Sequence, residues 1–412
     1  MNGAAEDASS AAARRFLANA AGLSADRPEG VRPVVAAMPF SRIGQVAMSA
    51  LGDPSVIPLW FGEGDLPTPS FICEAAAAAL RAGQTFYTFK RGIPELRRTI
   101  AEYLSGLYAK PVTDERVIVT SSGMSGIMFM CQALVEPGDN VVIVSPVWPN
   151  IHDAATVLGG EAREVALDAR AEGGWRLDLA RLKAACDART RAVFVNSPGN
   201  PTGWMMNRDE AAELLAFTRK RGLWLVADEV YARLVYDGRR AAPSLLDHAE
   251  PEDRVVVINS FSKAWAMTGW RLGWLVAPKE IQDVADKLVE FNTSCAPPFL
   301  QQAGITAIRD GEEFVAEMVA RCRRGRDLLI QGLQRFRRVH VAAPEGAFYA
   351  FCRVDGVSDS LAFAKEILAR CKVGVAPGAA FGQGGEGYLR FCFASAPERL
   401  AAALERLEPM LG

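Results

Sequence analysis

From about residue 116 to about residue 292, apolar β-branched runs alternate with amphipathic stretches that have the spacing of surface helices. Strands that alternate with helices form a parallel sheet, because each parallel crossover needs a helix-sized connection. The runs LWLVAD, VVVINSF and LGWLVAP are nearly all apolar, which is typical of central strands that helices cover on both faces. The pattern therefore predicts an α/β domain built on a buried, mostly parallel sheet.

The two ends of the chain differ from this pattern. Residues 1–35 are Ala-rich and end in RPEGVRP, where prolines oppose a continuous helix, so we expect an N-terminal arm. After residue 296, helical stretches are followed by the strand-like runs AFYAFCRV and GYLRFCFA. This mixture predicts a separate, smaller α+β domain.

Composition excludes several classes of protein. The chain has 412 residues, with 46 Lys and Arg against 48 Asp and Glu, and a net charge of −2 argues against a protein that wraps a polyanion. The eight cysteines lack the short spacing of zinc or dithiol sites, and the three histidines are scattered, so we expect reduced thiols and no metal site. No apolar run reaches the roughly 18–20 residues that span a bilayer, and no signal peptide is evident, so we expect a cytoplasmic protein.

Polar residues follow four of the predicted strands. In open parallel sheets, ligands bind beyond the carboxyl ends of the strands, which makes these positions candidates for a site. The candidates are Asp228 and Tyr231 after LWLVA, Asn200 in NSPGNPTG, Ser260, Ser262 and Lys263 after VVVIN, and Ser122 and Gly123 after VIVT. Taken singly, each has a structural interpretation as a helix cap, a turn or a solvated charge.

The segment SFSKAWAMTGWRLGW changes this balance, because it places Lys263 shortly before Arg271 and next to the Asp228 strand. A pyridoxal phosphate site needs a lysine amine, an acid against the ring nitrogen, donors on the phenolic oxygen and a cationic, hydroxyl-rich cradle for the phosphate. The sequence supplies one candidate for each group. We therefore predict that the chain binds pyridoxal 5'-phosphate.

Further segments extend this pattern over nearly everything after residue 35. In order they are LWFGEGDLPTP, FYTFKRGIPELRRTIAEYL, VTSSGMSGI, SPVWPN, NSPGNPTG, ADEVY, SFSKAWAMTGWRLGW and PGAAFGQGGEGYLRFCFA. Together they resemble the class I and II aminotransferase family, the aspartate aminotransferase-like branch of the fold type I pyridoxal-phosphate enzymes.

The resemblance implies a large domain with a central, mostly parallel sheet and a smaller α+β domain formed by the two chain ends. The expected boundaries are an arm at 1–35, the N-terminal part of the small domain at 36–66, the large cofactor-binding domain at 67–296 and the C-terminal part of the small domain at 297–412.

The resemblance also implies roles for the candidate residues. Lys263 would form the internal aldimine, Asp228 would pair with the pyridine nitrogen, and Tyr231 would address the phenolic oxygen, so these three are the expected catalytic residues. Asn200 would contact both the phenolic oxygen and the substrate. The phosphate would lie on the helix N-terminus at Ser122, Gly123 and Met124, closed by Ser260, Ser262 and Arg271.

Four more residues complete the implied site. Arg390 would bind the α-carboxylate of the substrate as a bidentate fork, with the backbone of Gly62 nearby. Trp148 would stack on the cofactor ring beside the substrate. Tyr87 would reach the phosphate of the neighbouring subunit, which implies a homodimer. A core tryptophan and an exposed strand arginine are the structural alternatives for Trp148 and Arg390.

The implied reaction moves the α-amino group of an L-amino acid to a 2-keto acid by ping-pong chemistry, with 2-oxoglutarate expected as acceptor. A C–S lyase or another α-carbon eliminating enzyme on the same fold is an alternative. Similarity to lyases would place a histidine near Asn200, whereas Gly199 stands there. A regulatory effector module would need a DNA-binding domain that about 35 residues cannot hold, and TSSGMSG does not match the glycine fingerprint of a nicotinamide dehydrogenase.

The sequence leaves the donor open among aspartate, alanine, aromatic and other amino acids. Some relatives that use dicarboxylic substrates place an arginine shortly before a Pro-Pro pair, and EFNTSCAPPF has none. Arg42 or Lys90 are substitute cations, and Phe40, Phe86 and Trp148 are candidates for an apolar pocket.

Overall fold

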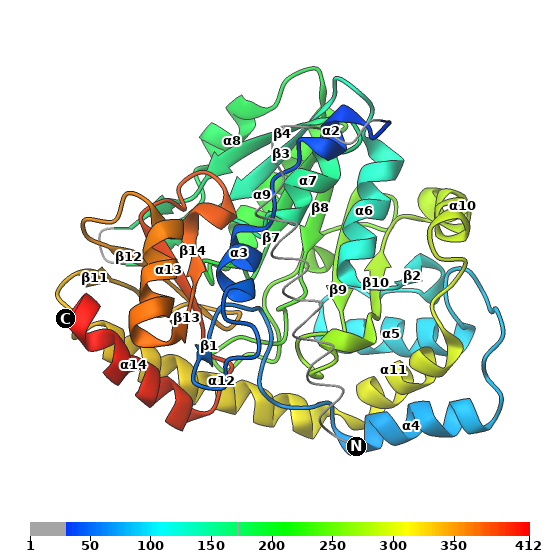
Figure 1. Ribbon diagram of the computed structural model, residues 1–412. Coiled ribbons are helices and arrows are strands. Elements are labelled where there is room, and N and C mark those ends of the chain that lie inside the picture. Colours follow the sequence, from blue (N-terminus) through cyan, green and yellow to red (C-terminus); the bar gives the residue numbers. More distant parts are fainter. Residues whose placement is uncertain (1–29, 171–172) are drawn as a thin grey trace.

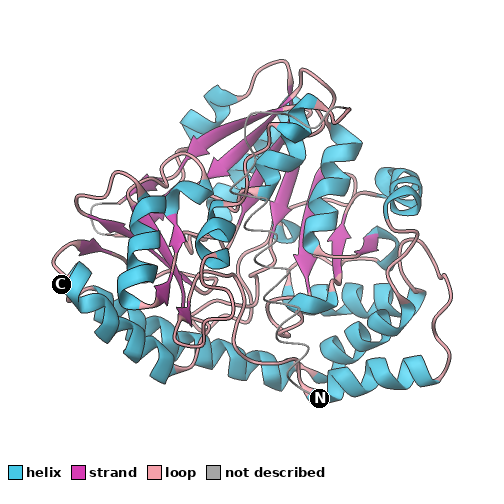
Figure 2. Ribbon diagram, in the orientation of Figure 1, coloured by secondary structure: helices cyan, strands magenta, loops and turns pink. Residues whose placement is uncertain are grey.

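The computed structural model describes residues 30–170 and 173–412, so most of the predicted arm at 1–35 lies outside the described residues. Within the described part, a large unit is built on a seven-stranded sheet and a smaller unit on a four-stranded one (Figures 1 and 2). In the large sheet only β10 runs antiparallel to its neighbours. The prediction of a mostly parallel α/β fold is therefore confirmed. The spatial order is β2 (Val117–Thr120), β10 (Gly273–Val276), β9 (Val255–Ser260), β8 (Trp224–Asp228), β7 (Thr190–Asn196), β3 (Asn140–Ser145) and β4 (Glu161–Ala166).

Alternate residues of these strands enter two separate hydrophobic cores. Val193 and Val195 belong to one core, whereas Phe194 between them belongs to the other. Helices cover both faces, which explains why the strands read as continuous apolar runs. One face is covered by α6 (Gly123–Leu134), α7 (Asn150–Thr156) and α10 (Gln282–Asn292). The other is covered by α4 (Ser70–Arg81), α5 (Pro94–Leu107), α8 (Leu179–Ala185), α9 (Arg208–Arg221) and α11 (Pro298–Asp310).

The small unit joins both ends of the described chain. Strand β1 (Ile57–Pro58) pairs in parallel with β13 (Val373–Gly374), which ties the N-terminal segment to the C-terminal one. The long helix α12 runs from the large unit into the small one along the lower side of Figure 1. The antiparallel sheet has the order β11 (Val339–His340), β12 (Tyr349–Val354), β15 (Tyr388–Cys392) and β14 (Ala376–Pro377). The remaining elements are α2 (Pro33–Ala36), α3 (Arg42–Met48), the hairpin β5 (Asp168–Ala169) and β6 (Trp175–Arg176), α12 (Glu312–Leu333), α13 (Ser360–Cys371) and α14 (Pro397–Leu411).

None of the helices in residues 30–170 and 173–412 is both long enough and apolar enough to cross a membrane. The eight cysteines are all free thiols in the structure. The predicted domain boundaries stay a prediction.

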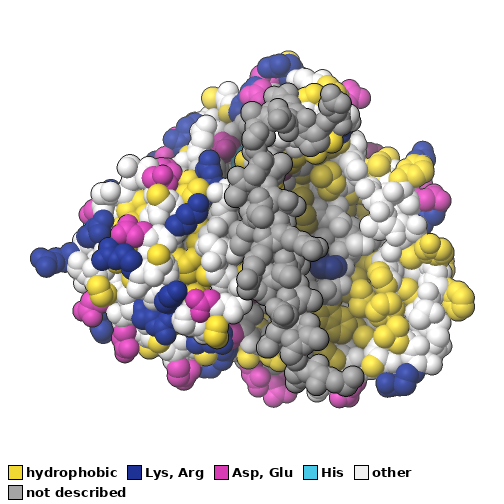
Figure 3. Space-filling model, in the orientation of Figure 1, with side chains coloured by type: hydrophobic (Ala, Val, Ile, Leu, Met, Phe, Trp, Pro, Cys, Tyr) yellow, Lys and Arg dark blue, Asp and Glu magenta, His cyan; other side chains and the backbone are white. Residues whose placement is uncertain are grey.

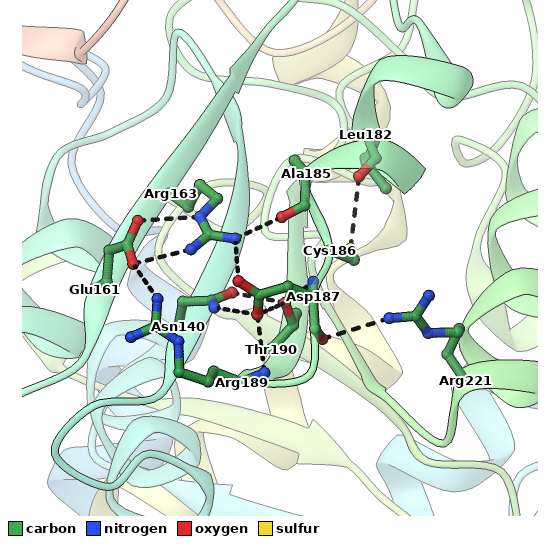
Figure 4. Close-up of polar contacts among 10 residues, drawn as sticks. All are labelled: Asn140, Glu161, Arg163, Leu182, Ala185, Cys186, Asp187, Arg189, Thr190 and Arg221. Atoms are coloured by element: carbon green, nitrogen blue, oxygen red, sulfur yellow. Dashed lines mark hydrogen bonds and ion pairs between the residues drawn. The ribbon is translucent and has the colours of Figure 1, made fainter.

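The amino edge of the large sheet carries a self-contained polar network. Figure 4 shows Arg163 between Glu161 and Asp187, with N–O distances of 3.0 Å to both carboxylates. Asn140, the first residue of β3, donates from Nδ2 to Asp187 at 2.9 Å. These contacts hold the pKa of Asp187 well below its ordinary value, through the Asn140 hydrogen bond first and then Arg163. The charged side chains shown in Figure 4 thus form hydrogen bonds or ion pairs with other residues of the protein, and these contacts stabilise the strand ends.

Candidate active site

The carboxyl edge of the large sheet opens into a cavity of about 650 Å³. Strand register brings the polar strand ends together: Asn196 lies opposite Asp228, and Gly273 lies opposite both Thr120 and Ser260. Two of the predicted site residues do not line the cavity, Ser122 and Tyr87. Those that do are Gly62, Gly123, Met124, Trp148, Asn200, Asp228, Tyr231, Ser260, Ser262, Lys263, Arg271 and Arg390.

Asp228 brings a buried carboxyl to the cavity wall. Its Oδ1 accepts a hydrogen bond from the backbone N–H of Val230 at 3.2 Å, and Asn196 fixes the strand end by donating to the Asp228 carbonyl at 2.9 Å. Burial raises the pKa of Asp228 to about 6, although the Val230 hydrogen bond and the positive charge of Lys263 oppose this shift. A cation held against this carboxyl would favour its ionised form.

Lys263 follows β9 and places its amine inside the same cavity. Its Nζ donates to the Gly62 carbonyl and lies 5.6 Å from the centre of the Tyr231 ring and 5.8 Å from that of Phe348. Burial lowers the pKa of Lys263 to about 8. A substantial fraction of the amine is therefore neutral near physiological pH, as a nucleophile or base requires.

The N-terminus of α6 borders the cavity, and two glycines lie beside it, Gly123 and Gly273. Ser122 caps the helix by accepting from the Ser125 N–H at 2.9 Å, so its hydroxyl supports the turn that presents the next N–H groups. A Cβ on Gly123 would lie 3.3 Å from Val230. A Cβ on Gly273 would lie 2.8 Å from the Asn259 carbonyl oxygen and from the Gly123 nitrogen. Helix N-termini attract anions, so this arrangement suits a phosphate.

Hydroxyl groups and a guanidinium complete this cradle. Ser260 and Ser262 are buried and hydrogen-bonded to each other at 2.8 Å. Arg271 has a left-handed backbone, with φ of 54°, and its Nη1 donates to the Thr268 carbonyl at 2.6 Å. The resulting set of N–H, O–H and guanidinium donors is the set that phosphate recognition uses.

Arg390 is a nearly fully buried arginine that the small unit contributes. Its Nη1 donates to Asn200 Oδ1 at 2.9 Å, and its Nη2 donates to the Trp60 carbonyl. The guanidinium carbon lies 4.4 Å from the centre of the Tyr349 ring and 4.9 Å from that of Phe381. Its Nε is buried and has no hydrogen-bond partner in the part of the chain that the structure describes. No carboxylate of the described residues forms an ion pair with it, so the site suits the carboxylate of a ligand.

The sequence profile of the family described as aminotransferase class I and II matches residues 56–407. The chain belongs to the class I and II aminotransferase family. It is similar to an aspartate aminotransferase of Thermotoga maritima, with 35% identity over 86% of this chain and 91% of that protein. It is also similar to an aromatic-amino-acid aminotransferase of Thermococcus litoralis, with 34% identity over 94% and 97%.

Solved structures give the same assignment. The aspartate aminotransferase of Thermus thermophilus with maleate superposes with a TM-score of 0.85 at 33% identity, covering 93% of this chain and all of that one. The aromatic aminotransferase of Pyrococcus horikoshii superposes with a TM-score of 0.81 at 33% identity, covering 90% and 98%. The prediction of an aminotransferase of fold type I is therefore confirmed.

The aminotransferase site also contains residues that the sequence analysis did not single out. Asn196 ends β7 and accepts the Asn200 N–H on its Oδ1 at 2.7 Å, and Tyr349 places its hydroxyl 2.7 Å from that of Tyr231. Asn196 had a detectable signal, because it ends an apolar run as Asp228 does. Tyr349 lies inside the apolar run AFYAFCRV, and nothing in its spacing separates it from a core aromatic residue.

Several residues considered for the site lie elsewhere. Tyr87 is 88% exposed and belongs to the surface loop between α4 and α5. Lys90 pairs with Glu290 at 2.6 Å, and Arg42 donates to the Ala379 carbonyl. Neither cation lines the cavity, nor do Phe40 and Phe86, whereas Trp148 does.

Proposed function

We propose that this aminotransferase binds pyridoxal 5'-phosphate at Lys263 and transfers the α-amino group of an L-amino acid to a 2-keto acid. One observation carries the proposal: a single cavity contains a buried acid, a lysine amine, an anion cradle on a helix N-terminus and a buried arginine that pairs with no carboxylate among residues 30–170 and 173–412.

These groups fit the cofactor in kind and in number. The start of α6 at Ser122, Gly123 and Met124, with Ser260, Ser262 and Arg271, would hold the phosphate, and Trp148 would stack on the ring. Asn200 and Tyr231 would donate hydrogen bonds to the phenolic oxygen of the cofactor. When bound, pyridoxal phosphate supplies an electron sink for the bonds of the substrate's α-carbon.

Asp228 would keep the ring nitrogen protonated. Burial raises the pKa of its carboxyl to about 6, because it disfavours the charged form. A pyridinium N–H against the carboxylate reverses this balance through charge and hydrogen bonding. The acid would therefore be ionised when it is needed as a counter-charge.

Lys263 would act as the base. Its Nζ, with a pKa of about 8, would take the α-proton from the substrate as a neutral amine and would deliver it to the carbon that carries the amino group after transfer. The Gly62 carbonyl accepts a hydrogen bond from this amine and holds it inside the cavity.

Arg390 would orient the substrate by holding its α-carboxylate. Asn200 and the Trp60 carbonyl fix the guanidinium plane, so little side-chain entropy is lost when the carboxylate binds.

The substrate classes are proposed from the relatives. Their names give aspartate and aromatic amino acids as the substrates of those proteins. We take an amino acid of one of these classes as donor and 2-oxoglutarate as acceptor, with ping-pong kinetics. We also propose a homodimer in which Tyr87 reaches the phosphate of the neighbouring subunit, since this side chain is exposed and does not line the cavity of its own chain.

The test is the absorption spectrum of the purified protein with bound pyridoxal phosphate, before and after single amino acids are added without any keto acid. We expect the band of the aldehyde form to convert to that of the amine form with certain donors, which identifies the donor class. A band that persists while ammonia or sulfide is released would indicate a lyase instead. The absence of any band after pyridoxal phosphate is supplied would contradict the cofactor assignment.

Lys263→Ala provides the matched variant. We expect it to lose turnover entirely, because neither the covalent attachment nor the base remains, while pyridoxal phosphate still binds through the cradle. Equilibrium dialysis measures this binding independently of activity. Full turnover of the variant would refute the role of Lys263.

A further inference from the structure

We propose that Tyr349 is a positioning residue that directs the hydroxyl of Tyr231 toward the bound cofactor and couples it to Arg390. This inference rests on the proposed function, since it assumes pyridoxal phosphate in the cavity and Tyr231 at its phenolic oxygen.

Tyr349 is the first residue of β12 and has no solvent exposure. It lines the cavity, and its hydroxyl oxygen lies 2.7 Å from that of Tyr231. A tyrosyl hydroxyl has one proton to donate and lone pairs to accept. Only one of the two protons can therefore occupy this hydrogen bond, and the direction of the bond decides whether the Tyr231 proton is available to the cavity.

Arg390 favours Tyr349 as the donor. Its guanidinium carbon lies 4.4 Å from the centre of the Tyr349 ring, closer than Lys263 Nζ is to the Tyr231 ring, at 5.6 Å. A cation over the face of a phenol makes its O–H a better donor, because the phenolate character of the oxygen is stabilised. When Tyr349 donates, Tyr231 accepts and keeps its own proton free to point into the cavity.

Gly62 fixes the position of the Tyr349 hydroxyl. A Cβ on Gly62 would lie 2.3 Å from this oxygen, so the hydroxyl packs directly against the Gly62 backbone. The carbonyl of the same residue accepts the Lys263 amine. The Tyr349 hydroxyl thus contacts Tyr231 and Gly62, and its ring lies under Arg390, so Tyr349 touches the groups assigned to the cofactor, the lysine and the substrate carboxylate.

This arrangement predicts a measurable coupling. A carboxylate bound to Arg390 neutralises the cation over the Tyr349 ring and weakens Tyr349 as a donor. This weakens the hydrogen bond that Tyr231 accepts from Tyr349. Tyr231 therefore changes how strongly it stabilises negative charge on the phenolic oxygen of the cofactor. A carboxylate ligand should therefore shift the pH at which the absorption band of the bound cofactor changes, and part of this shift should depend on Tyr349.

The experiment is a pH titration of that band in the holoenzyme. We expect Tyr349→Phe to raise the midpoint by about half a unit to one unit, because Tyr231 loses the hydrogen bond that orients its hydroxyl and makes it a stronger donor to the phenolic oxygen. In a Tyr231→Phe background the same substitution should cause no further shift, because its effect passes through Tyr231. Succinate added to the unmodified holoenzyme should move the midpoint more than in Tyr349→Phe.

Tyr236→Phe is the matched control. Tyr236 is also buried in the small-unit core, and its hydroxyl donates to the Ala347 carbonyl, but it does not line the cavity. We expect this variant to lose some thermal stability and to keep the midpoint of the unmodified enzyme.

Two results would overturn the inference. One is an unchanged midpoint in Tyr349→Phe, and the other is a shift of equal size in the presence and absence of the Tyr231 hydroxyl. If the unmodified protein shows no band with pyridoxal phosphate, the proposed function itself fails and this inference fails with it.

Discussion

Asp228 and Glu229 are adjacent buried acids at the end of β8, and they have different surroundings. Asp228 lines the cavity, whereas Glu229 accepts the Leu245 N–H on Oε1 at 3.1 Å and does not line it. Burial raises the pKa of both carboxyls, to about 6 for Asp228 and about 8 for Glu229. Raised pKa values alone therefore do not distinguish the functional acid from the structural one. What distinguishes them is that Asp228 lines the cavity and Glu229 does not.

Asp228→Asn should reduce turnover by roughly 10²- to 10⁴-fold, the usual cost of removing one electrostatic group from an active site. The amide cannot hold a proton on the ring nitrogen, while the volume of the side chain is nearly unchanged. Glu229→Gln is the matched control and should retain turnover. Steady-state kinetics of both purified variants decide the point, and equal losses would leave Asp228 with a structural role only.

Asp228→Asn should lower turnover but should raise the stability of the cofactor-free protein. The folded pKa of Asp228 is about 6, above the ordinary value of 3.8, so the folded state binds this proton more tightly than the unfolded state. The free energy of unfolding therefore falls as the pH rises from about 4 to about 6, and it stays at this lower value above pH 6.

We expect cofactor-free Asp228→Asn to be more stable than the unmodified protein at pH 8, by on the order of 1–3 kcal/mol, and nearly equal to it at pH 4. Urea unfolding at the two pH values measures the difference. A gain of the same size at pH 4 would show that charge burial is not its cause.

Single residues were predicted from sequence where polar side chains interrupt apolar runs. Asp228, Lys263 and Asn200 follow buried strands, and it is their combination in one pattern, not any one of them, that predicted a site. Tyr349 could not be found in this way, because an aromatic residue within an apolar strand has the same pattern whether its hydroxyl faces a cavity or the core. Its proximity to Tyr231 depends on how the small unit packs against the large one.

At the scale of elements, the two edges of the large sheet use polar groups differently. At the amino edge, Arg163, Asp187 and Asn140 satisfy one another. At the carboxyl edge, the start of α6 is left open by Gly123 and Gly273. The alternation of strands and helices predicted a site at the carboxyl edge, since the carboxyl ends of parallel strands meet there, but not the network at the amino edge.

Gly273→Ala tests whether the first turn of α6 forms part of the phosphate cradle. The added Cβ would lie 2.8 Å from the Asn259 carbonyl oxygen and from the Gly123 nitrogen, so the first turn of α6 must move. We expect the affinity of the cofactor-free protein for pyridoxal phosphate to fall by about tenfold to a hundredfold, as overpacking of this kind costs.

Gly106→Ala is the control for this substitution. Gly106 is exposed near the end of α5, and a Cβ there meets nothing within 4 Å. We expect a gain in stability of about 0.5–1 kcal/mol from helix propensity and unchanged cofactor affinity. Cofactor titration followed by fluorescence measures both variants, and equal affinities would exclude the cradle role of this turn.

At the scale of the whole molecule, one surface exposes several aromatic side chains. Phe86, Tyr87, Phe89 and Phe291 form an exposed aromatic patch on the loop between α4 and α5 and at the end of α10. The contacts of Thr88 with Cys295 and of Lys90 with Glu290 hold the two segments together. Figure 3 shows hydrophobic side chains gathered on this side of the molecule, at the right. Clusters of this kind mark interaction surfaces, which agrees with the proposed homodimer.

Phe291→Asp should weaken the proposed dimer. Phe291 is 82% exposed in the single chain, and a buried unpaired carboxylate in an interface is costly. Light scattering should show a concentration-dependent shift toward monomer, while the circular dichroism of the folded chain is retained. A monomeric unmodified protein would contradict the dimer before any variant is made.

Mixing two impaired variants tests whether Tyr87 acts across the interface. We expect Tyr87→Ala to bind the cofactor weakly and to have low turnover, and Lys263→Ala to have no turnover. In a hybrid dimer, the subunit that carries Tyr87→Ala keeps its own Lys263 and receives Tyr87 from its partner, so one of the two sites is complete. Refolding the two variants together should therefore recover activity that neither has alone. If Tyr87 instead acts within its own chain, both sites of the hybrid are defective and no activity returns, because each then contains one of the two substitutions.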